Sequence, residues 1–227
     1  MRVLSYGLGL TKGERRVAGS DTLIQASDRD SEALAPKQAH LIRSAYKVMG
    51  EKGLSHLSLQ DVADEADVSK AILPYYFDSK ENLILLTMRW VLARVAQRIR
   101  EAIDQVESAE GKVSAMVDAI FVSPEANRRF YLVFFDFLGY AARNERFADV
   151  SAIFHEICNG LYAEVIRVGQ KEGVFNARDA REEAAVVRAL VDGLFTQWIQ
   201  DKDWKKTHAE CREVCKRSIL TYLSAGA

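Results

Sequence analysis

The sequence predicts an all-α fold of nine helices, and three observations support this prediction. Proline and glycine, the residues that interrupt helices, occur only 3 and 13 times in 227 residues. Apolar residues recur at three- and four-residue spacing along most of the chain. No segment shows the alternation of a convincing strand. With 48% hydrophobic residues, the chain is long enough to bury one or two cores.

Composition also excludes several classes of protein. No run of about 18 uncharged apolar residues exists, so we expect no membrane-spanning helix. The N-terminus lacks the apolar centre of a signal peptide. The three cysteines are an odd number and indicate reduced thiols in a cytoplasmic protein. The net charge of −1 excludes a polycation.

Residues 1–35 contain few large apolar side chains and carry five basic and five acidic residues. We interpret them as a mobile arm or as an extension upstream of the natural start. An alternative is an arm that reaches DNA through Arg15 and Arg16, although acidic residues are interleaved with the basic ones.

Residues 36–82 have the pattern of a helix-turn-helix domain. Pro36 opens an amphipathic helix that Gly50 and Gly53 end. Ser58 caps a second helix over residues 58–66, and Asp61 stands where it can bond back to the cap. Ser69 begins a third helix, which "FDSKEN" ends. Three short helices of which the last two are joined by three or four residues form a helix-turn-helix.

Residues 83–227 continue as a helical bundle. Ser79 caps a long helix over residues 79–108. Five further helices are expected in residues 112–122, 123–144, 145–172, 179–200 and 204–224. Pro124 favours a helix start and Gly173 a helix end.

The third helix has the character of a segment that contacts DNA. Ser69 caps it, Lys70 offers a charge to phosphate, and Ala71 and Ile72 offer apolar contact to a thymine methyl. Tyr75 and Tyr76 follow one turn later, where their hydroxyls can bond phosphate, whereas Leu73 and Phe77 are expected in the domain core. Residues 36–90 carry seven basic and seven acidic side chains, so any DNA footprint must come from where the charges stand.

Pro74 interrupts this helix beyond its first turn. Its missing N–H would have bonded the carbonyl of Lys70. We therefore expect a helix that is distorted or ends early, in a tight 3₁₀ turn. The favoured interpretation is that Pro74 ends a short helix. The alternative is that it sets the angle of Tyr75 and Tyr76 over the DNA backbone.

The stretch "SLQDVADEADVSKAILPYYFDSKENLI" gives residues 37–83 a specific resemblance to the DNA-binding domain of the TetR family of bacterial repressors. The matching residues are Ala63, Ala66, Val68, Ser69, Leu73, Tyr76, Phe77, Lys80, Glu81 and Leu83. The resemblance implies DNA contacts at Ser58, Ser69, Lys70, Tyr75, Tyr76 and Lys80. Pro74 departs from the tyrosine that the family often has, which removes one phosphate contact.

The remainder resembles the ligand-binding domain of the choline-responsive, BetI-type branch. That resemblance implies a homodimeric, ligand-responsive repressor, with double-stranded operator DNA, a small-molecule effector and a second copy of the chain as partners. The long helix from Ser79 would couple effector to DNA. Dimerisation is expected through the last two helices, at Ala185, Leu190, Leu194, Trp198, Cys211, Val214, Cys215, Ile219 and Tyr222. A two-fold dimer implies a pseudo-palindromic operator.

Asp136 stands among aromatic residues in "RRFYLVFFDFLGY", and a buried carboxylate needs a partner. One hypothesis is a cationic ligand held by Asp136 with aromatic rings around it; the alternative is a structural partner, Arg94 or Arg128. The candidate ligand set is Trp90, Arg94, Phe121, Phe134, Asp136, Phe137, Phe154, His155 and Cys158.

No catalytic or metal signature stands out. The pair His155 and Cys158 has no further ligand cluster. His208, Cys211 and Cys215 share one helix face and leave open a thiol sensor or metal site, although small hydrophobes in a helix seam are favoured. HExxH, GxSxG and CxxC motifs are missing. We expect no enzyme, metal or cofactor. The alternative functions are a helical small-molecule-binding or adaptor protein without sequence-specific DNA binding, and a small helical enzyme.

Overall fold

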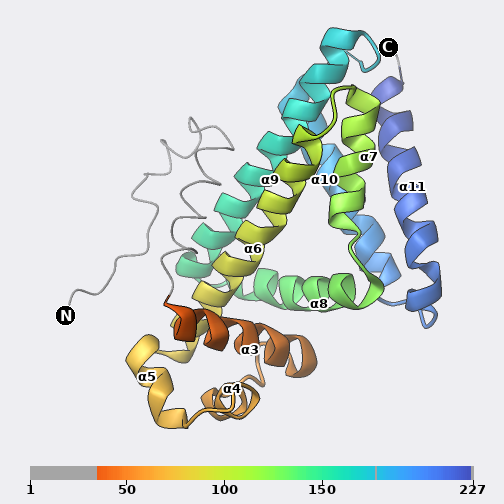
Figure 1. Cartoon of the computed structure of the whole chain (residues 1–227). Coiled ribbons are helices and arrows are strands. Elements are labelled where there is room, and N and C mark those ends of the chain that lie inside the picture. Colours follow the sequence, from red (N-terminus) through yellow and green to blue (C-terminus); the bar gives the residue numbers. More distant parts are fainter. Residues whose placement is uncertain (1–34, 177, 226–227) are drawn as a thin grey trace. The chain divides into compact units, whose positions relative to one another are not determined.

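The computed structural model describes residues 35–176 and 178–225, and all regular elements in these ranges are helical, as predicted (Figure 1). The expectations for an N-terminal arm fall almost wholly on residues outside the described ones. The elements are α3 (Pro36–Lys52), α4 (Leu59–Glu65), the 3₁₀ helix η1 (Lys70–Ile72), α5 (Leu73–Tyr76), α6 (Lys80–Asp104), α7 (Ala109–Ile120), α8 (Pro124–Ala141), α9 (Glu145–Glu172), α10 (Ala180–Trp198) and α11 (Trp204–Ser224).

The boundary between α6 and α7 differs from the expected one. α6 ends at Asp104 rather than at residue 108, and α7 begins at Ala109 rather than at 112. The reason is a cap: the Ser108 hydroxyl accepts the N–H of Gly111 at 3.3 Å. The Glu172 carboxylate accepts the N–H of Ala109 at 3.1 Å, so a second free donor of the α7 start is satisfied.

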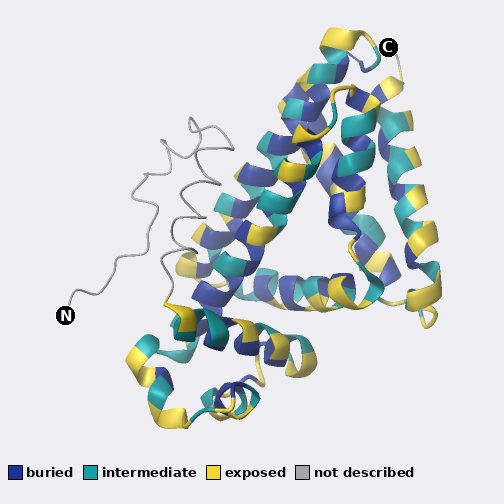
Figure 2. Cartoon of the chain, in the orientation of Figure 1, coloured by how far each residue is buried: buried dark blue, intermediate teal, exposed yellow. Residues whose placement is uncertain are grey.

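The helix-turn-helix has its own small core. Much of α3 and α4 is coloured as buried or half-buried (Figure 2). Leu73 and Phe77 lie inside at 0% and 2% exposure, as the sequence predicts. The His40 imidazole on α3 bonds the Ala66 carbonyl at 3.0 Å and so holds the end of α4. The residues that fill this core are Leu41, Ile42, Ala45, Val48, Met49, Leu54, Leu57, Val62, Ala63, Leu73 and Phe77.

The described residues divide into two compact units. The first contains residues 35–94 and 132–154, and the second contains 95–131 and 155–225 without residue 177. Helices α6, α8 and α9 each contribute one end to each unit. Phe134, Phe137 and Phe147 are buried in the first unit, and Phe121 and Phe195 are buried in the second. No helix in the described ranges is both long and apolar enough to cross a membrane.

The end of α9 depends on two glycines. Gly173 has φ +75°, a conformation that favours glycine. The N–H of Val174 then bonds the carbonyl of Gly169 at 2.9 Å, and the Phe175 ring folds back over Gly169. A Cβ at residue 169 would stand 2.0 Å from Cδ2 of Phe175. The predicted helix end at Gly173 is therefore confirmed. The lack of a side chain at Gly169 leaves the space that the Phe175 ring occupies.

Candidate nucleic-acid interface and ligand site

Residues Ser69–Tyr76, which we call the reading segment, form two short turns rather than one helix. The Ser69 hydroxyl accepts the N–H of Ala71 at 3.4 Å and caps η1. The N–H of Leu73 bonds the Lys70 carbonyl, which closes the 3₁₀ turn. α5 follows directly, and the N–H of Phe77 bonds the Leu73 carbonyl at 2.9 Å. The segment is held by local hydrogen bonds and by burial of Leu73.

Pro74 lies near the start of α5 and does not end a helix. The expected 3₁₀ turn is present, but it precedes the proline. Because the N–H of Leu73 already satisfies the Lys70 carbonyl, the missing N–H of Pro74 costs no hydrogen bond. The favoured interpretation of a terminating proline is therefore wrong, since the helix continues to Tyr76. A proline suits a first helical turn, where its N–H has no intrahelical partner.

The side chains expected to touch DNA differ in exposure. Tyr75 is 73% exposed, the largest value among the large hydrophobic residues that the structure describes as exposed. Its ring meets that of Tyr76 edge-on, with centroids 5.0 Å apart. The outward set is Ser58, Ser69, Lys70, Ala71 and Tyr75, and the partly buried set is Ile72, Tyr76 and Lys80.

Ser58 is occupied by the cap of α4. Its hydroxyl accepts the N–H of Asp61 at 3.1 Å and lies 2.7 Å from the Asp61 carboxylate, which also accepts the Ser58 N–H at 3.1 Å. The predicted capping box is thus confirmed. The Lys52 ammonium at 2.6 Å and the Ser58 hydroxyl hold the pKa of Asp61 below its ordinary value. A phosphate at Ser58 would compete with this carboxylate for the hydroxyl.

Two ion pairs of the helix-turn-helix take up two basic and two acidic side chains. Lys47 pairs with Glu65 at 2.8 Å, and Lys52 pairs with Asp61. In the part of the chain that the structure describes, no hydrogen bond or ion pair holds the ammonium of Lys70. These pairs consume two lysines together with two acidic residues of α4, whereas the charge of Lys70 stays available at the reading segment.

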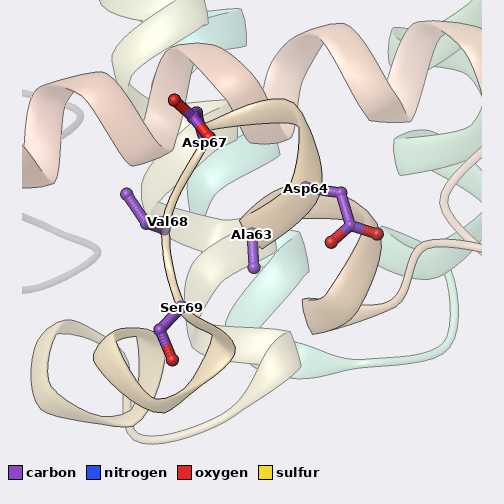
Figure 3. Close-up of a pocket in the computed structure, with 5 residues that line it drawn as sticks. All are labelled: Ala63, Asp64, Asp67, Val68 and Ser69. Atoms are coloured by element: carbon purple, nitrogen blue, oxygen red, sulfur yellow. The ribbon is translucent and has the colours of Figure 1, made fainter.

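A shallow depression of about 440 Å³ lies at the turn between α4 and η1, lined by Ala63, Asp64, Asp67, Val68 and Ser69 (Figure 3). The carboxylates of Asp64 and Asp67 point apart in Figure 3. Asp67 adopts φ +52°, which acidic residues tolerate better than most. Gln60 donates to Asp64 at 2.7 Å. The depression follows from the turn geometry and has neither convergent ligands nor positive charge.

The position of Asp136 contradicts the hypothesis that this residue is buried and holds a cationic ligand. The residue is exposed rather than buried among the aromatic rings. Its Oδ2 accepts the N–H of Leu54 at 3.1 Å, and it would lie 3.1 Å from a Cβ at Gly53. Neither Arg94 nor Arg128 is its partner: Arg94 lies over Trp90, and Arg128 donates to the Ile199 carbonyl. Asp136 holds the loop between α3 and α4 and does not face a buried ligand.

The aromatic candidates pack in separate groups. Phe134 meets Phe154 edge-on at 5.7 Å, and the Arg94 guanidinium lies 5.2 Å from the centre of the Trp90 ring. In the second unit, Phe121 stacks on Phe195 with centroids 4.4 Å apart. Phe137 is fully buried beside Phe147 at 5.7 Å. These contacts account for the rings as core packing within each unit.

Sequence reasoning missed the charged partner of the His155 and Cys158 face. Arg188 of α10 is 7% exposed and lies within hydrogen-bonding reach of the Cys158 thiol. Burial lowers the pKa of His155 to about 4, so its imidazole is neutral at pH 7. The helical periodicity of the sequence could have revealed Arg188, because this residue lies on the same buried face of α10 as Ala184 and Phe195. The described residues contain no cluster of three or more metal-binding side chains.

The residues expected at a dimer seam fall into two groups. Trp198, Cys215 and Ile219 are 4%, 0% and 0% exposed and belong to the core of the protomer. Burial raises the pKa of Cys211 to about 11 and that of Cys215 to about 12, which disfavours a reactive thiolate. His208 bonds Asn127 at 2.9 Å. The outward or partly outward group is Ala185, Leu190, Leu194, Cys211, Val214 and Tyr222.

Comparisons with known proteins match both parts of the chain. A family model described as BetI-type transcriptional repressor, C-terminal, matches residues 109–224. A model of the tetR family of bacterial regulatory proteins matches residues 41–86. The HTH-type transcriptional regulator BetI of Brucella anthropi is 24% identical over 159 residues, which are 70% of this chain and 79% of that protein. The HTH-type transcriptional repressor KstR2 of Rhodococcus jostii is 24% identical over 148 residues, or 65% of this chain and 72% of that protein.

Solved structures share the fold. A putative transcriptional regulator from Saccharomonospora viridis, in complex with choline, superposes with a TM-score of 0.75 at 23% identity. The match covers 82% of this chain and 96% of that one. A TetR regulator from Haloarcula marismortui has a TM-score of 0.73 at 23% identity, covering 85% and 98%.

Proposed function

The chain belongs to the TetR family of bacterial regulatory proteins and carries the BetI-type repressor domain at its C-terminus, and from this premise we propose how it binds and releases DNA. Proteins of this family are transcriptional regulators rather than enzymes, which agrees with the expectation from the sequence. As a homodimeric repressor it would bind a pseudo-palindromic operator and leave it when a small-molecule effector binds. Its place would be the cytoplasm, where bacterial DNA lies.

The observation that carries this proposal is the reading segment. Lys70 and Tyr75 are exposed at one end of a well-packed domain, in the stretch that matches the family model. A lysine and a phenol so placed can bond phosphates on either side of the major groove. We assign residues 36–82 to operator binding and residues 83–227 to effector binding and dimerisation.

The test is binding to DNA from upstream of the chain's own gene, measured by fluorescence anisotropy against a scrambled duplex of equal length. We expect tighter binding to the upstream DNA and an affinity that falls steeply with salt. Equal affinity for both duplexes would favour the alternative of a helical ligand-binding or adaptor protein.

Two helices can carry a signal from effector to DNA. α6 begins at Lys80, shortly after the reading segment, and the Ser79 hydroxyl accepts the N–H of Asn82 at 3.0 Å. Its residues 80–94 belong to the first unit and residues 95–104 to the second. A shift of this helix would therefore move the base of the helix-turn-helix. This is the coupling helix that the sequence suggests.

α8 offers a second connection. Asp136 accepts the N–H of Leu54, and the hydroxyl of Tyr140, one turn later, lies 3.5 Å from that of Ser55. The Lys80 ammonium donates to the Ser55 carbonyl at 3.3 Å. The loop that leads from α3 to α4 is thus held from α8 and α6 together. We infer that these contacts set the orientation of the α4 N-terminus.

Replacing Asp136 by alanine is expected to weaken operator binding about fivefold, because a typical intramolecular hydrogen bond contributes about 1 kcal/mol. Asp136→Asn keeps an oxygen acceptor and should retain most of the affinity. Anisotropy titrations of both variants check this. Equal loss in both variants would mean that the carboxylate charge matters rather than the bond to Leu54.

The dimer is proposed to form through the outward faces of α10 and α11. Val186 is 39% exposed, and Leu190 and Leu194 follow at helical spacing on α10. Nothing lies within 4 Å of a Cβ built at Gly193, so this face has room for the close approach of a second helix. Cys211, Val214 and Tyr222 continue an apolar stripe on α11. These features support a four-helix seam between two copies.

Leu190→Arg is expected to convert the dimer to a monomer at about 10 µM, because two arginines would meet across the two-fold axis in a desolvated seam. Light scattering after size exclusion measures the mass. Leu132→Arg is the matched control: Leu132 is 38% exposed on α8, outside the proposed seam, and this variant should remain dimeric. A dimeric Leu190→Arg protein would place the interface elsewhere.

A further inference from the structure

A cluster of buried and half-buried polar side chains lies in the second unit, between α9 and α10. His155, Cys158, Asn159 and Tyr162 stand on one face of α9, at successive helical spacings. Arg188 of α10 lies near the thiol of Cys158. Cys158 and Tyr162 are 1% and 4% exposed. The core packing of the fold does not by itself account for so many polar groups at one place.

Two atoms of this cluster lack hydrogen-bond partners. Nε2 of His155 and Oδ1 of Asn159 are shielded from solvent, and no group in the described chain bonds either of them. A buried polar atom without a partner costs roughly 1–3 kcal/mol. Such atoms in a native protein usually meet a bound molecule or water. Two of them one helical turn apart indicate a polar ligand.

The charge of the cluster indicates the sign of that ligand. Arg188 is permanently charged and 7% exposed. Its carboxylate neighbour, Asp192, lies 3.4 Å from Nε, and the side chain of Asp192 is 32% exposed. The cation is therefore the deeper member of the pair. Burial raises the pKa of Asp192, and the neighbouring Arg188 guanidinium opposes that rise.

The remaining ionisable groups add no negative charge. Burial keeps the pKa of His155 low, so this imidazole is neutral. Burial raises the pKa of Tyr131 and Tyr162 well above the ordinary value, so both phenols keep their protons and can donate. The thiol of Cys158 is likewise protonated, because burial raises its pKa. Beside the ion pair of Arg188 with Asp192, the cluster therefore presents neutral groups, and the Arg188 guanidinium is the more deeply buried charge of that pair.

We propose that the effector of this regulator carries a carboxylate, which Arg188 binds, and a polar substituent next to it, which His155 and Asn159 contact. A planar guanidinium matches a carboxylate in shape and charge. A quaternary amine would instead bring a second positive charge against Arg188. This inference rests on the proposed function, since it names the chemical class of its effector.

The test is a thermal-shift panel on the full-length chain. The probes are straight-chain carboxylates of four to ten carbons, phenylacetate and 4-hydroxyphenylacetate. Each is paired with the trimethylammonium compound of the same carbon skeleton. We expect at least one carboxylate to raise the melting temperature by several degrees, and no trimethylammonium compound to match it.

Two variants separate ligand binding from a structural ion pair. Arg188→Met should abolish the shift. Asp192→Asn keeps Arg188 but removes the competing carboxylate, so the same acid should bind at least about threefold more tightly. If Arg188 serves the fold alone, both variants lower the melting temperature and neither changes the ligand preference, which would overturn the proposal. Stabilisation by the amines alone, or by no carboxylate, would overturn it too.

Operator binding of the ligand-free protein is measured on the same samples. Intact operator binding without a response to any carboxylate rejects the effector class alone. Loss of sequence-specific operator binding in the wild-type chain rejects the regulatory function itself. If Arg188→Met fails to fold, Asp192→Asn still decides between the two roles. A binding role predicts tighter binding of the carboxylate, and a structural role predicts a lower melting temperature with unchanged ligand preference.

Discussion

The double variant Lys70→Ala, Tyr75→Ala is expected to lose operator binding by at least about a hundredfold. Both side chains leave the surface of the reading segment without supporting the core, since Tyr75 is 73% exposed. A dimer loses four phosphate contacts at once, and even about 1 kcal/mol for each would approach a thousandfold. The slope of log K against the logarithm of the salt concentration should also become shallower by about 2, because two lysine charges no longer displace counterions.

The matched control is Lys202→Ala, which removes the same charge from an exposed loop between α10 and α11. It should keep the operator affinity and the salt slope of the wild-type chain. Light scattering should show that the double variant remains a dimer with an unchanged melting temperature. Loss of the dimer would contradict the separation of DNA binding from dimerisation, and retained affinity would reject the reading segment as the contact site.

Gly169→Ala is expected to cause the largest loss of stability from a single methyl group. The new Cβ would overlap the Phe175 ring, with 2.0 Å to Cδ2 and 2.5 Å to Cε2. Phe175 is 3% exposed, so the ring must leave its site or the end of α9 must move. We expect the free energy of unfolding to fall by about 3 kcal/mol and the melting temperature by roughly 6–12 °C.

Gly139→Ala tests the same substitution where space is available. A Cβ there meets only the Arg143 side chain, at 3.7 Å. Because alanine favours a helix interior by about 1 kcal/mol over glycine, this variant should be slightly more stable than wild type. Chemical unfolding of both variants measures the difference. Equal stability of the two proteins would show that Phe175 relaxes at little cost.

Much of the fold could be predicted because local chemistry decides it. The cap at Ser58, the stop at Gly173 and the inward positions of Leu73 and Phe77 follow from short-range rules and were predicted correctly. The end of α6 was misplaced, although "SAEG" contains the Ser108 cap. The prediction relied on apolar periodicity, which continues on both sides of the break between α6 and α7 and therefore does not reveal it.

Asp136 was misjudged because aromatic neighbours in sequence were taken for neighbours in space. On α8, Glu125, Arg129 and Asp136 recur at intervals of four and seven residues, which marks an outward stripe. The sequence thus contained the evidence that Asp136 is exposed. Its bond to Leu54, 82 residues away, depends on tertiary packing and could not be predicted.

The candidate dimer seam illustrates the same limit. Periodicity identifies the apolar positions of α10 and α11 but does not say which of them face the protomer. Trp198, Cys215 and Ile219 face inward, where the indole N–H of Trp198 donates to the Trp204 carbonyl at 2.8 Å. Two apolar faces on one helix are distinguished only once the neighbouring helices are in place.

The short reading segment limits the information that one protomer can extract from DNA. Three residues in a 3₁₀ turn and four in an α turn extend over about 12 Å, which matches three to four base pairs at about 3.4 Å each. Two half-sites would then specify about seven base pairs, or roughly 14 bits. A bacterial genome contains many such matches by chance. Half-site spacing and the stiffness of the intervening DNA must therefore supply the remaining discrimination, so in a selection from random DNA we expect two short invariant blocks at one fixed separation.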